Sequence, residues 1–302
     1  RYFIEMLSEE DYRLLRTAGE IAKKVRSVVP ALVREGVDAL TIAQTVEDKI
    51  VEYGGRPAFP CNICVNSVAA HFTPTPVENI IIPSGALVKV DLGVECGGYI
   101  ADTAVTVGLP NSQVKLIEAA ENALRNAIKI VRSGIRASEI GNVINETVSQ
   151  YGFKPIRNLS GHEIKKYSLH SGTSIPNVKT KETTKLEYGK IYAIEPFVTL
   201  GTGSGLVVSS STVNIFSIQM EYLDEERLSH DELNLLRELK TSTRGLPYTL
   251  RWIEREKWQL HEKLVKRGVI KGYPVLVEKV GAPVAQAEHT IIVLEEGCEV
   301  VT

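Results

Sequence analysis

The chain has 302 residues and a mass of 33.3 kDa, which suits one large domain with room for an insertion. Hydrophobic residues make up 43% and charged residues 24%, and no apolar run reaches the roughly 18 residues of a membrane span, so a disordered chain and a membrane-inserted chain are excluded. Lys plus Arg (35) nearly balances Asp plus Glu (37), and the net charge of −2 gives no general attraction to nucleic acid.

The cysteines and the N-terminal residues indicate a reducing compartment. Four cysteines are too few for a disulfide framework, and no charged-then-apolar secretion signal opens the chain. We therefore expect a cytoplasmic protein. Cys61 and Cys64 form a C-x-x-C pair, but no second pair or nearby histidine completes a zinc site, so we interpret both thiols as packing groups.

Two helical segments repeat within the chain. Residues 33–54 and 131–152 align without a gap at an offset of 98 residues, with seven identical positions. In each copy one glycine opens a turn and a second glycine closes the amphipathic helix that follows. These glycines are Gly36, Gly54, Gly134 and Gly152. Another helix is predicted before each copy, over about 9–29 and about 112–131.

A strand-rich segment follows each copy and carries acidic residues at matching places. The run rich in Val, Ile and Tyr that ends at Asp91 aligns with the run that ends at Glu195, glycine on glycine. In the first half the chain then turns and returns as a second hairpin strand, which carries Asp102. In the second half the return strand, predicted over 285–293, carries Glu288. We expect each half to deliver two carboxylates to one shared centre.

About eighty residues are inserted before the return strand of the second half. Apolar residues at helical spacing and a turn near 244–247 predict a helical subdomain over about 218–275, within a single catalytic domain that spans 1–302. A DNA-reading winged helix is the alternative. Residues 224–271 hold 11 Lys and Arg against 9 Asp and Glu, too weak a bias for following phosphates, so we favour a cap that walls a pocket.

Four carboxylates in one cleft must either take up protons or bind cations. Carboxylate oxygens with one imidazole suit manganese, iron, cobalt or zinc, and four carboxylates balance two divalent ions. His162, in a glycine-containing loop between the halves, is the best imidazole candidate. His71 and His170 are separated by nearly the repeat offset, which favours positions beside the metal centre, although each alone suits a structural role. His289 should point away from Glu288 on an alternating strand.

Taken together, four motifs resemble those of methionine aminopeptidases. They are Lys89-Val-Asp91-Leu-Gly93 with Asp102, Asn158-Leu-Ser-Gly-His162, Tyr192-Ala-Ile-Glu195 and Ala285-Gln-Ala-Glu288-His-Thr-Ile. The resemblance runs from about residue 10 to the end of the chain, and the long insertion resembles the type 2 branch, archaeal or eukaryotic-like. It implies an α+β, pita-bread (creatinase/aminopeptidase-like) fold with two halves related by a pseudo-twofold axis and an inserted helical subdomain.

The resemblance also implies an activity and a metal site. The enzyme would be a metalloaminopeptidase that removes the initiator methionine from nascent polypeptides with a small second residue. Asp91 would bind one divalent ion, Asp102 and Glu288 would bridge two, and His162 with Glu195 would complete the second site. The ions, cobalt, manganese, iron or zinc, would activate the attacking water, and Glu195 would act as general base.

Three further residues receive roles from the resemblance. His71 would hold the substrate near its leaving amide, His170 would stabilise the oxyanion, and Phe59 would form a wall of the methionine pocket. The family usually has His or Gln where Glu95 stands and a small polar residue where Gly97 stands, so we expect a different local turn geometry.

The expected partner is the N-terminus of a nascent peptide that starts with Met, with the ribosome as a further candidate. We expect a monomer that binds neither nucleic acid directly nor a membrane. Two alternatives share the fold. A prolidase or aminopeptidase P carries an extra N-terminal domain, whereas only 90 residues precede Asp91 here. A catalytically silent binding module would have lost metal ligands, whereas all five are present here.

Overall fold

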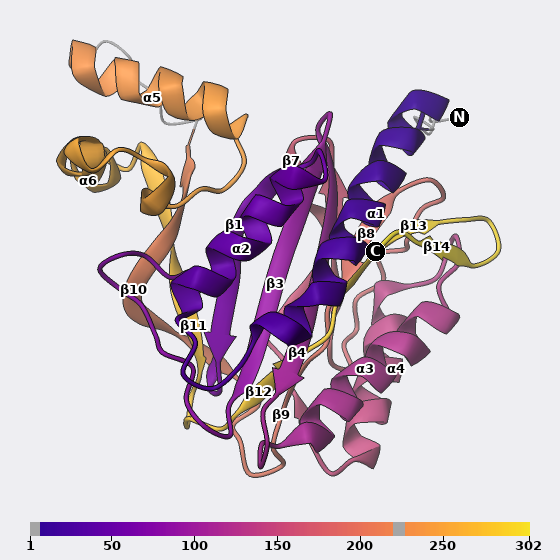
Figure 1. Ribbon diagram of the computed structural model, residues 1–302. Helices are drawn as coiled ribbons and strands as arrows, with labels where there is room; N and C mark the ends of the chain where they lie inside the picture. Colours follow the sequence, from indigo (N-terminus) through magenta and orange to yellow (C-terminus); the bar gives the residue numbers. More distant parts are fainter. Residues whose placement is uncertain (1–6, 220–226) are drawn as a thin grey trace.

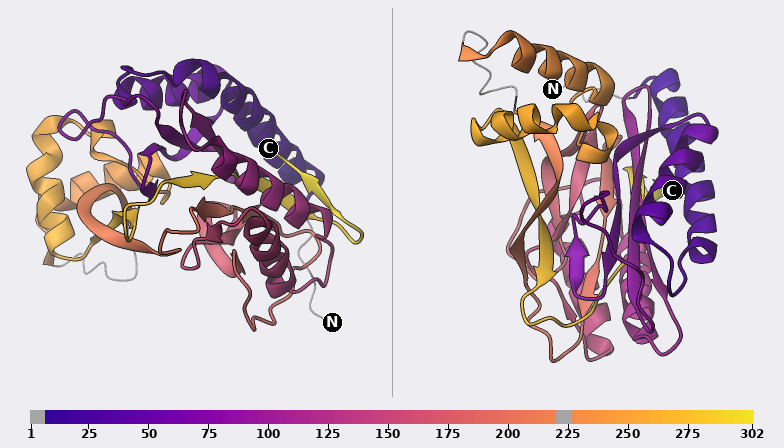
Figure 2. Two further views of the ribbon diagram at one scale, coloured as in Figure 1. Left: turned by 90° about the horizontal axis from the view of Figure 1, so that it is seen from below. Right: turned by 60° about the vertical axis from the view of Figure 1, so that its left-hand side comes forward.

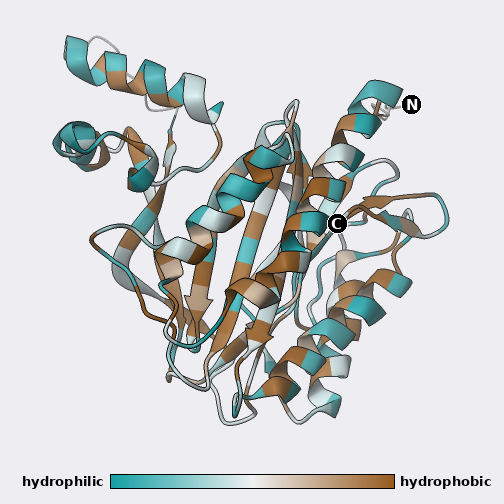
Figure 3. Cartoon of the chain, viewed as in Figure 1, coloured by the Kyte–Doolittle hydropathy of each residue, from teal (hydrophilic) through white to brown (hydrophobic). Residues whose placement is uncertain are grey.

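The computed structural model describes residues 7–219 and 227–302, and it is a mixed α and β structure in which four helices lie outside the strands (Figures 1 and 2). These helices are α1 (Glu9–Leu32), α2 (Ala39–Glu52), α3 (Val114–Lys129) and α4 (Ala137–Gln150). Their apolar faces turn towards the strands and their polar faces outwards (Figure 3). Among the described residues, no helix combines the length and apolarity that a membrane crossing requires.

The first half is a meander covered by α1 and α2. Its strands are β1 (Arg56–Val65), β2 (Val68–Ala70), β3 (Leu87–Cys96) and β4 (Tyr99–Gly108). The three long strands form an antiparallel sheet in the order β1-β3-β4, and β3 with β4 is the predicted hairpin. Ser8 caps α1 by accepting from the Asp11 amide, and the helix continues past its predicted end through Pro30 to Leu32.

The second half repeats this plan under α3 and α4. Its strands are β5 (Lys154–Pro155), β6 (Ser160–Lys165), β7 (Ser168–Pro176), β8 (Ile191–Ile194), β9 (Phe197–Thr199), β12 (Val284–Gln286), β13 (His289–Val293) and β14 (Cys298–Val300). They form one sheet in the order β14-β13-β8-β6-β7 and a smaller one in the order β12-β9-β5.

Matching backbone turns confirm the internal repeat. Gly36 and Gly134 both adopt left-handed φ values, +80° and +78°, which a glycine adopts without a steric penalty. Each donates its amide to the segment that precedes β3 or β8 in its own half, Gly36 to the Ile82 carbonyl and Gly134 to the Leu186 carbonyl, at 2.9 and 2.8 Å. In both halves the same turn therefore joins the two helices and bonds to the segment that leads into a strand.

The predicted return strand over 285–293 is not continuous, and this expectation was wrong. It is split into β12 and β13, with Glu288 at the break, where the Glu288 amide donates to the Ala104 carbonyl at 3.3 Å. Glu195 lies at a matching break between β8 and β9, because the next residue, Pro196, has no N–H for the ladder. The two breaks face each other, since the Ala287 amide donates to the Pro196 carbonyl.

The inserted segment forms a separate helical layer at one end of the strands (Figure 1). Strands β10 (Val207–Ile218) and β11 (Ile270–Glu278) pair with each other, and between them lie α5 (His230–Thr243), the 3-10 helices η3 (Leu250–Trp252) and η4 (Arg255–Lys257), and α6 (Trp258–Lys266). The helices pack around Leu236, Tyr248 and Leu264. Treating about 218–275 as a subdomain stays a prediction, and its residues 220–226 lie outside the described part.

Candidate metal centre

Asp91 and Asp102 point to the same face of the β3–β4 hairpin. In its register Asp91 pairs with Ala104 and Asp102 pairs with Gly93, so both acids occupy equivalent faces of neighbouring strands. A two-residue turn fixes this register. The hairpin therefore holds two carboxylates side by side on rigid backbone.

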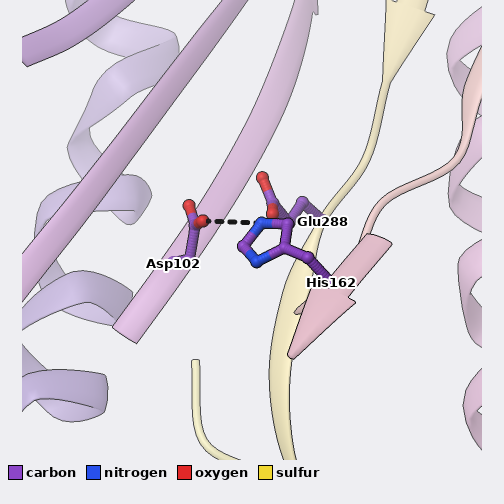
Figure 4. A group of neighbouring side chains, drawn as sticks. All are labelled: Asp102, His162 and Glu288. Carbon is purple, nitrogen blue, oxygen red and sulfur yellow. Dashed lines mark ion pairs between the residues drawn. The ribbon is translucent and has the colours of Figure 1, made fainter. Parts of the chain in front are cut away.

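The second half brings an imidazole and two more carboxylates to the same place. His162 on β6 pairs with Ala193 of β8, and its Nε2 lies 3.5 Å from Asp102 Oδ2 and 3.5 Å from Glu195 Oε1. Ligand atoms of Asp102, His162 and Glu288 all lie within 4.8 Å of one another, and Figure 4 shows the three side chains converging from three different segments of the chain. The structure thus gathers all five predicted metal ligands in one cavity.

The carboxylates of this centre are buried, and within residues 7–219 and 227–302 they form no ion pair with a lysine or an arginine. Asp91 Oδ1, Asp102 Oδ1 and Glu288 Oε1 are buried oxygens with no hydrogen-bond partner among the described residues. The Gln286 side-chain amide lies 3.3–3.4 Å from oxygens of Asp91, Glu195 and Glu288 and is shared among them. One amide cannot satisfy this number of acceptors.

Burial raises the pKa of all four acids. The pKa of Asp102 rises to about 8 because burial disfavours the carboxylate, and the pKa values of Asp91, Glu195 and Glu288 rise through burial and the neighbouring acids. Burial also lowers the pKa of His162 to about 4, which leaves its ring neutral and able to bind a metal. Oxygen acceptors without donors and one neutral imidazole fit divalent first-row metal ions.

The cavity has a volume of about 430 Å³, and the three other predicted site residues line it. Phe59 is buried on β1, and His170 on β7 lies with its ring centroid 4.2 Å from that of His162. His71 follows β2 with a left-handed φ of +67°, and its Nδ1 lies 3.3 Å from the Pro274 carbonyl. Burial lowers the pKa of His71, so its ring is neutral at pH 7.

The backbone that follows His71 is fixed from the insertion. Arg251 donates to Thr73 Oγ1 at 2.7 Å and to the Pro74 carbonyl at 3.2 Å, while Thr73 Oγ1 donates to the Cys61 carbonyl. A left-handed non-glycine residue persists only where surrounding contacts fix it. The insertion therefore supports the position of His71.

Sequence reasoning missed several residues of this cavity. Gln286 stands inside a quoted motif, but its neutral side chain gave no sign that it would face three acids. Lys271 and Tyr273 of β11 and Ile215 of β10 also line the cavity. They come from the insertion, where only knowledge of strand pairing could have indicated them.

The turn that departs from the family pattern connects the hairpin to the insertion. Glu95 is buried and accepts from the Gly98 amide at 2.5 Å, and Arg244 Nη1 lies 3.3 Å from Glu95 Oε1. Gly97 has a left-handed φ of +57°.

The C-x-x-C pair holds no disulfide. Cys61 and Cys64 are free and buried, and burial raises the pKa of Cys64 to about 12.

Comparison with known proteins identifies relatives over nearly the whole chain. A profile of metallopeptidase family M24 matches residues 13–222. The chain is 42% identical to a methionine aminopeptidase of Thermococcus onnurineus over 299 residues, which cover 97% of this chain and 100% of the relative.

Solved structures show the same fold at low sequence identity. A methionine aminopeptidase of Thermotoga maritima matches with a TM-score of 0.72 at 22% identity and 99% coverage of both chains. A thermophilic Arx1 matches with a TM-score of 0.84 at 18% identity, over 98% of this chain and 91% of the other. The predicted α+β pita-bread fold is thereby confirmed.

Proposed function

Because the chain belongs to metallopeptidase family M24, we propose that it is a metal-dependent aminopeptidase that removes the N-terminal methionine of nascent polypeptides. The observation that carries this proposal is the buried cluster of four carboxylates and one neutral imidazole, with several acceptor oxygens left without donors. Such a cluster must take up protons at neutral pH unless cations are bound, and bound cations let all four acids stay ionised.

Five side chains would hold two divalent ions. Asp91, Asp102, His162, Glu195 and Glu288 would be their ligands, since all five line one cavity. The four negative charges balance two divalent cations. When bound, the ions supply Lewis acidity to the scissile carbonyl and lower the pKa of the attacking water.

Glu195 carries the proton transfer. Its Oε1 lies 3.5 Å from His162 Nε2, and the residue stands at the backbone break before Pro196. A carboxylate in this place accepts a proton from the attacking water and passes it to the leaving amine. Burial and the neighbouring acids raise the pKa of Glu195, and bound cations would lower it again.

The other cavity residues bind and orient the substrate. His71 and His170 are neutral donors on the cavity wall, placed to bond the peptide amide and the developing oxyanion. The apolar walls Phe59, Leu169 and Ile215 are buried and suit a thioether side chain. They also exclude water around the reacting bond.

The decisive experiment is a peptide assay with defined metal. Protein loaded with manganese or cobalt should release methionine from Met-Ala-Ser and leave X-Pro peptides intact. Cleavage of X-Pro peptides alone would show that the enzyme is a prolidase instead. Failure to cleave either peptide, with metal bound, would favour a silent binding module.

The compartment and partners extend this proposal. The cytoplasm is the compartment in which initiator methionine is removed from nascent chains, and the four free cysteines suit it. A contact with the ribosome and a monomeric state stay predictions, which sedimentation with and without ribosomes would test.

A further inference from the structure

A second cavity of about 480 Å³ lies beside the helices α1 and α3, and its lining shares only Glu288 with the described lining of the catalytic cavity. Residues of α1, α3 and β4, the segment 286–289 and Val300 line it. Its walls are largely apolar, with Leu124 and Ile128 of α3 on one side. The volume is typical of sites for small organic ligands.

Strand alternation separates the two cavities. Successive strand residues point to opposite faces, so the neighbours of the metal-site acids point towards the helices. Asp102 is followed by Thr103, and Glu288 is followed by His289. Both neighbours contact Arg26 of α1. Arg26 Nη1 donates to Thr103 Oγ1 at 2.6 Å and to His289 Nδ1 at 3.0 Å.

Arg26 is a half-buried cation without a carboxylate partner. No carboxylate of residues 7–219 and 227–302 lies within 4 Å of its guanidinium, and its two recorded acceptors are uncharged. Burial therefore lowers the pKa of Arg26 with no opposing charge. A desolvated guanidinium with free N–H groups is an energetic cost unless an anion is present.

His289 adds a neutral donor. Its Nδ1 accepts from Arg26, and Thr302 Oγ1 lies 2.9 Å from the same nitrogen. A neutral histidine whose Nδ1 accepts must carry its proton on Nε2. His289 lines the cavity, and no partner for Nε2 is recorded in the described part of the chain.

Two more cations line the same cavity from α3. Arg125 and Lys129 are one helical turn apart, and neither forms an ion pair within the described ranges. Glu121 is an opposing acid in the lining, and the carboxylate of the other acid there, Glu288, belongs to the metal centre. Three cations thus face one free carboxylate, which leaves a surplus of positive charge.

We propose that this cavity binds a small organic anion. Arg26, Arg125 and Lys129 hold its phosphate or carboxylate group, and the apolar walls of α3 hold its body. Arginine forks and lysine ammonium groups are the usual donors to both kinds of oxyanion. Among the described residues that line the two cavities, Glu288 alone is shared, so the three cations lie outside the catalytic cavity.

Titration calorimetry on the metal-loaded protein tests the proposal, with phenyl phosphate and benzoate as probes and inorganic phosphate and acetate as headgroup controls. At least one aromatic probe should bind once per chain at millimolar concentration or below, and more tightly than its headgroup alone. Arg125→Ala and Lys129→Ala should each weaken that binding by about tenfold or more, the scale of one charged hydrogen bond. Lys115→Ala removes the same charge from α3 outside the cavity and should leave binding unchanged.

The metal centre can itself bind anions, and the variants distinguish binding there from binding in the second cavity. Arg125 and Lys129 do not line the catalytic cavity, so their variants should keep full aminopeptidase activity. Arg26→Met should abolish binding, and the two α3 variants decide the question if that protein does not fold. Equal affinities in the wild type, Arg125→Ala and Lys129→Ala would overturn the proposal, as would an absence of binding by both aromatic probes.

Discussion

Two groups of buried carboxylates in this molecule are neutralised in different ways. Glu47 accepts from Arg251, from the Trp252 indole N–H at 2.9 Å and from the Cys61 amide at 2.9 Å. Glu278 accepts from the backbone amides of Val280 and Ala282, both at 2.9 Å, and from Ser204. These two acids are structural, because donors from the chain surround them.

The four acids of the metal centre lack such donors. Three of them, Asp91, Glu195 and Glu288, share one side-chain amide, that of Gln286. Oxygens of Asp91, Asp102 and Glu288 have no partner among the described residues. Burial raises the pKa of Glu278 as well, but its four hydrogen bonds outweigh burial and lower the net value, whereas the pKa of Asp102 rises to about 8. A buried acid without donors therefore marks the place where a cation must bind.

The largest expected effect comes from Glu195. Glu195→Gln should lower kcat by about 10²–10⁴-fold, because an amide cannot accept the proton of the attacking water. The fold should survive, since the side chain contacts only the centre. Steady-state kinetics and circular dichroism measure both effects, with Glu118→Gln on exposed α3 as the control. Near-normal turnover would mean that another group is the base.

A structural acid should respond through stability instead. Arg251→Met leaves Glu47 buried without its cation and should lower the free energy of unfolding by about 3–5 kcal/mol. The double variant Glu47→Gln with Arg251→Met should recover part of this loss. Lys257→Met, which breaks an exposed pair with Glu238, should leave stability unchanged in the same urea titration. If Arg251→Met and Lys257→Met lowered the free energy of unfolding equally, the distinction between the buried and the exposed ion pair would be wrong.

Removal of the metal should make stability depend on pH. An acid whose folded pKa is raised binds more protons when folded, so its contribution is intact below the unfolded pKa and is lost as pH rises through the folded value. For Asp102 this window runs from 3.8 to about 8. Below pH 6.5 the buried histidines, whose pKa values are lowered, oppose this trend, but above pH 6.5 they are neutral in both states. Thermal melts of metal-free protein should therefore show a falling Tm from pH 6.5 to about 8, and added manganese should restore Tm most at the upper end. A Tm that rises with pH over this interval in the metal-free protein would contradict the raised pKa values.

Gln286 should show the smallest of these effects. Gln286→Met removes the shared amide but keeps the volume, and should weaken metal binding by about 10–100-fold while the protein stays folded. Titration with manganese followed by calorimetry measures the change. Unchanged affinity would mean that the amide fills space without orienting the acids.

Local signals made much of the fold and centre predictable. Glycine turns at matching positions and acids at the ends of strand-like runs indicated the repeat, and with it the convergence of Asp91, Asp102, Glu195 and Glu288. These features depend on residues close together in the sequence. The roles of the five ligands, His71, His170 and Phe59 came from resemblance. The structure places these side chains in one cavity, and their individual roles stay predictions.

Contacts between segments far apart in the sequence could not be predicted from the sequence alone. The strand break at Glu288 depends on Pro196 opposite it, and the sequence of 285–293 alone reads as one strand. The contact of Arg26 with Thr103 and His289 joins three segments, so it needs tertiary structure. Strand alternation did predict that His289 points away from Glu288. The His289 side chain lies in the lining of the second cavity.

Metal stoichiometry tests the central assignment most directly. Elemental analysis after dialysis against manganese should give two ions per chain in the wild type and at most one in His162→Ala, which removes the imidazole of one site. A wild type that retains no manganese, or a variant that retains two ions, would contradict the assignment of the five ligands.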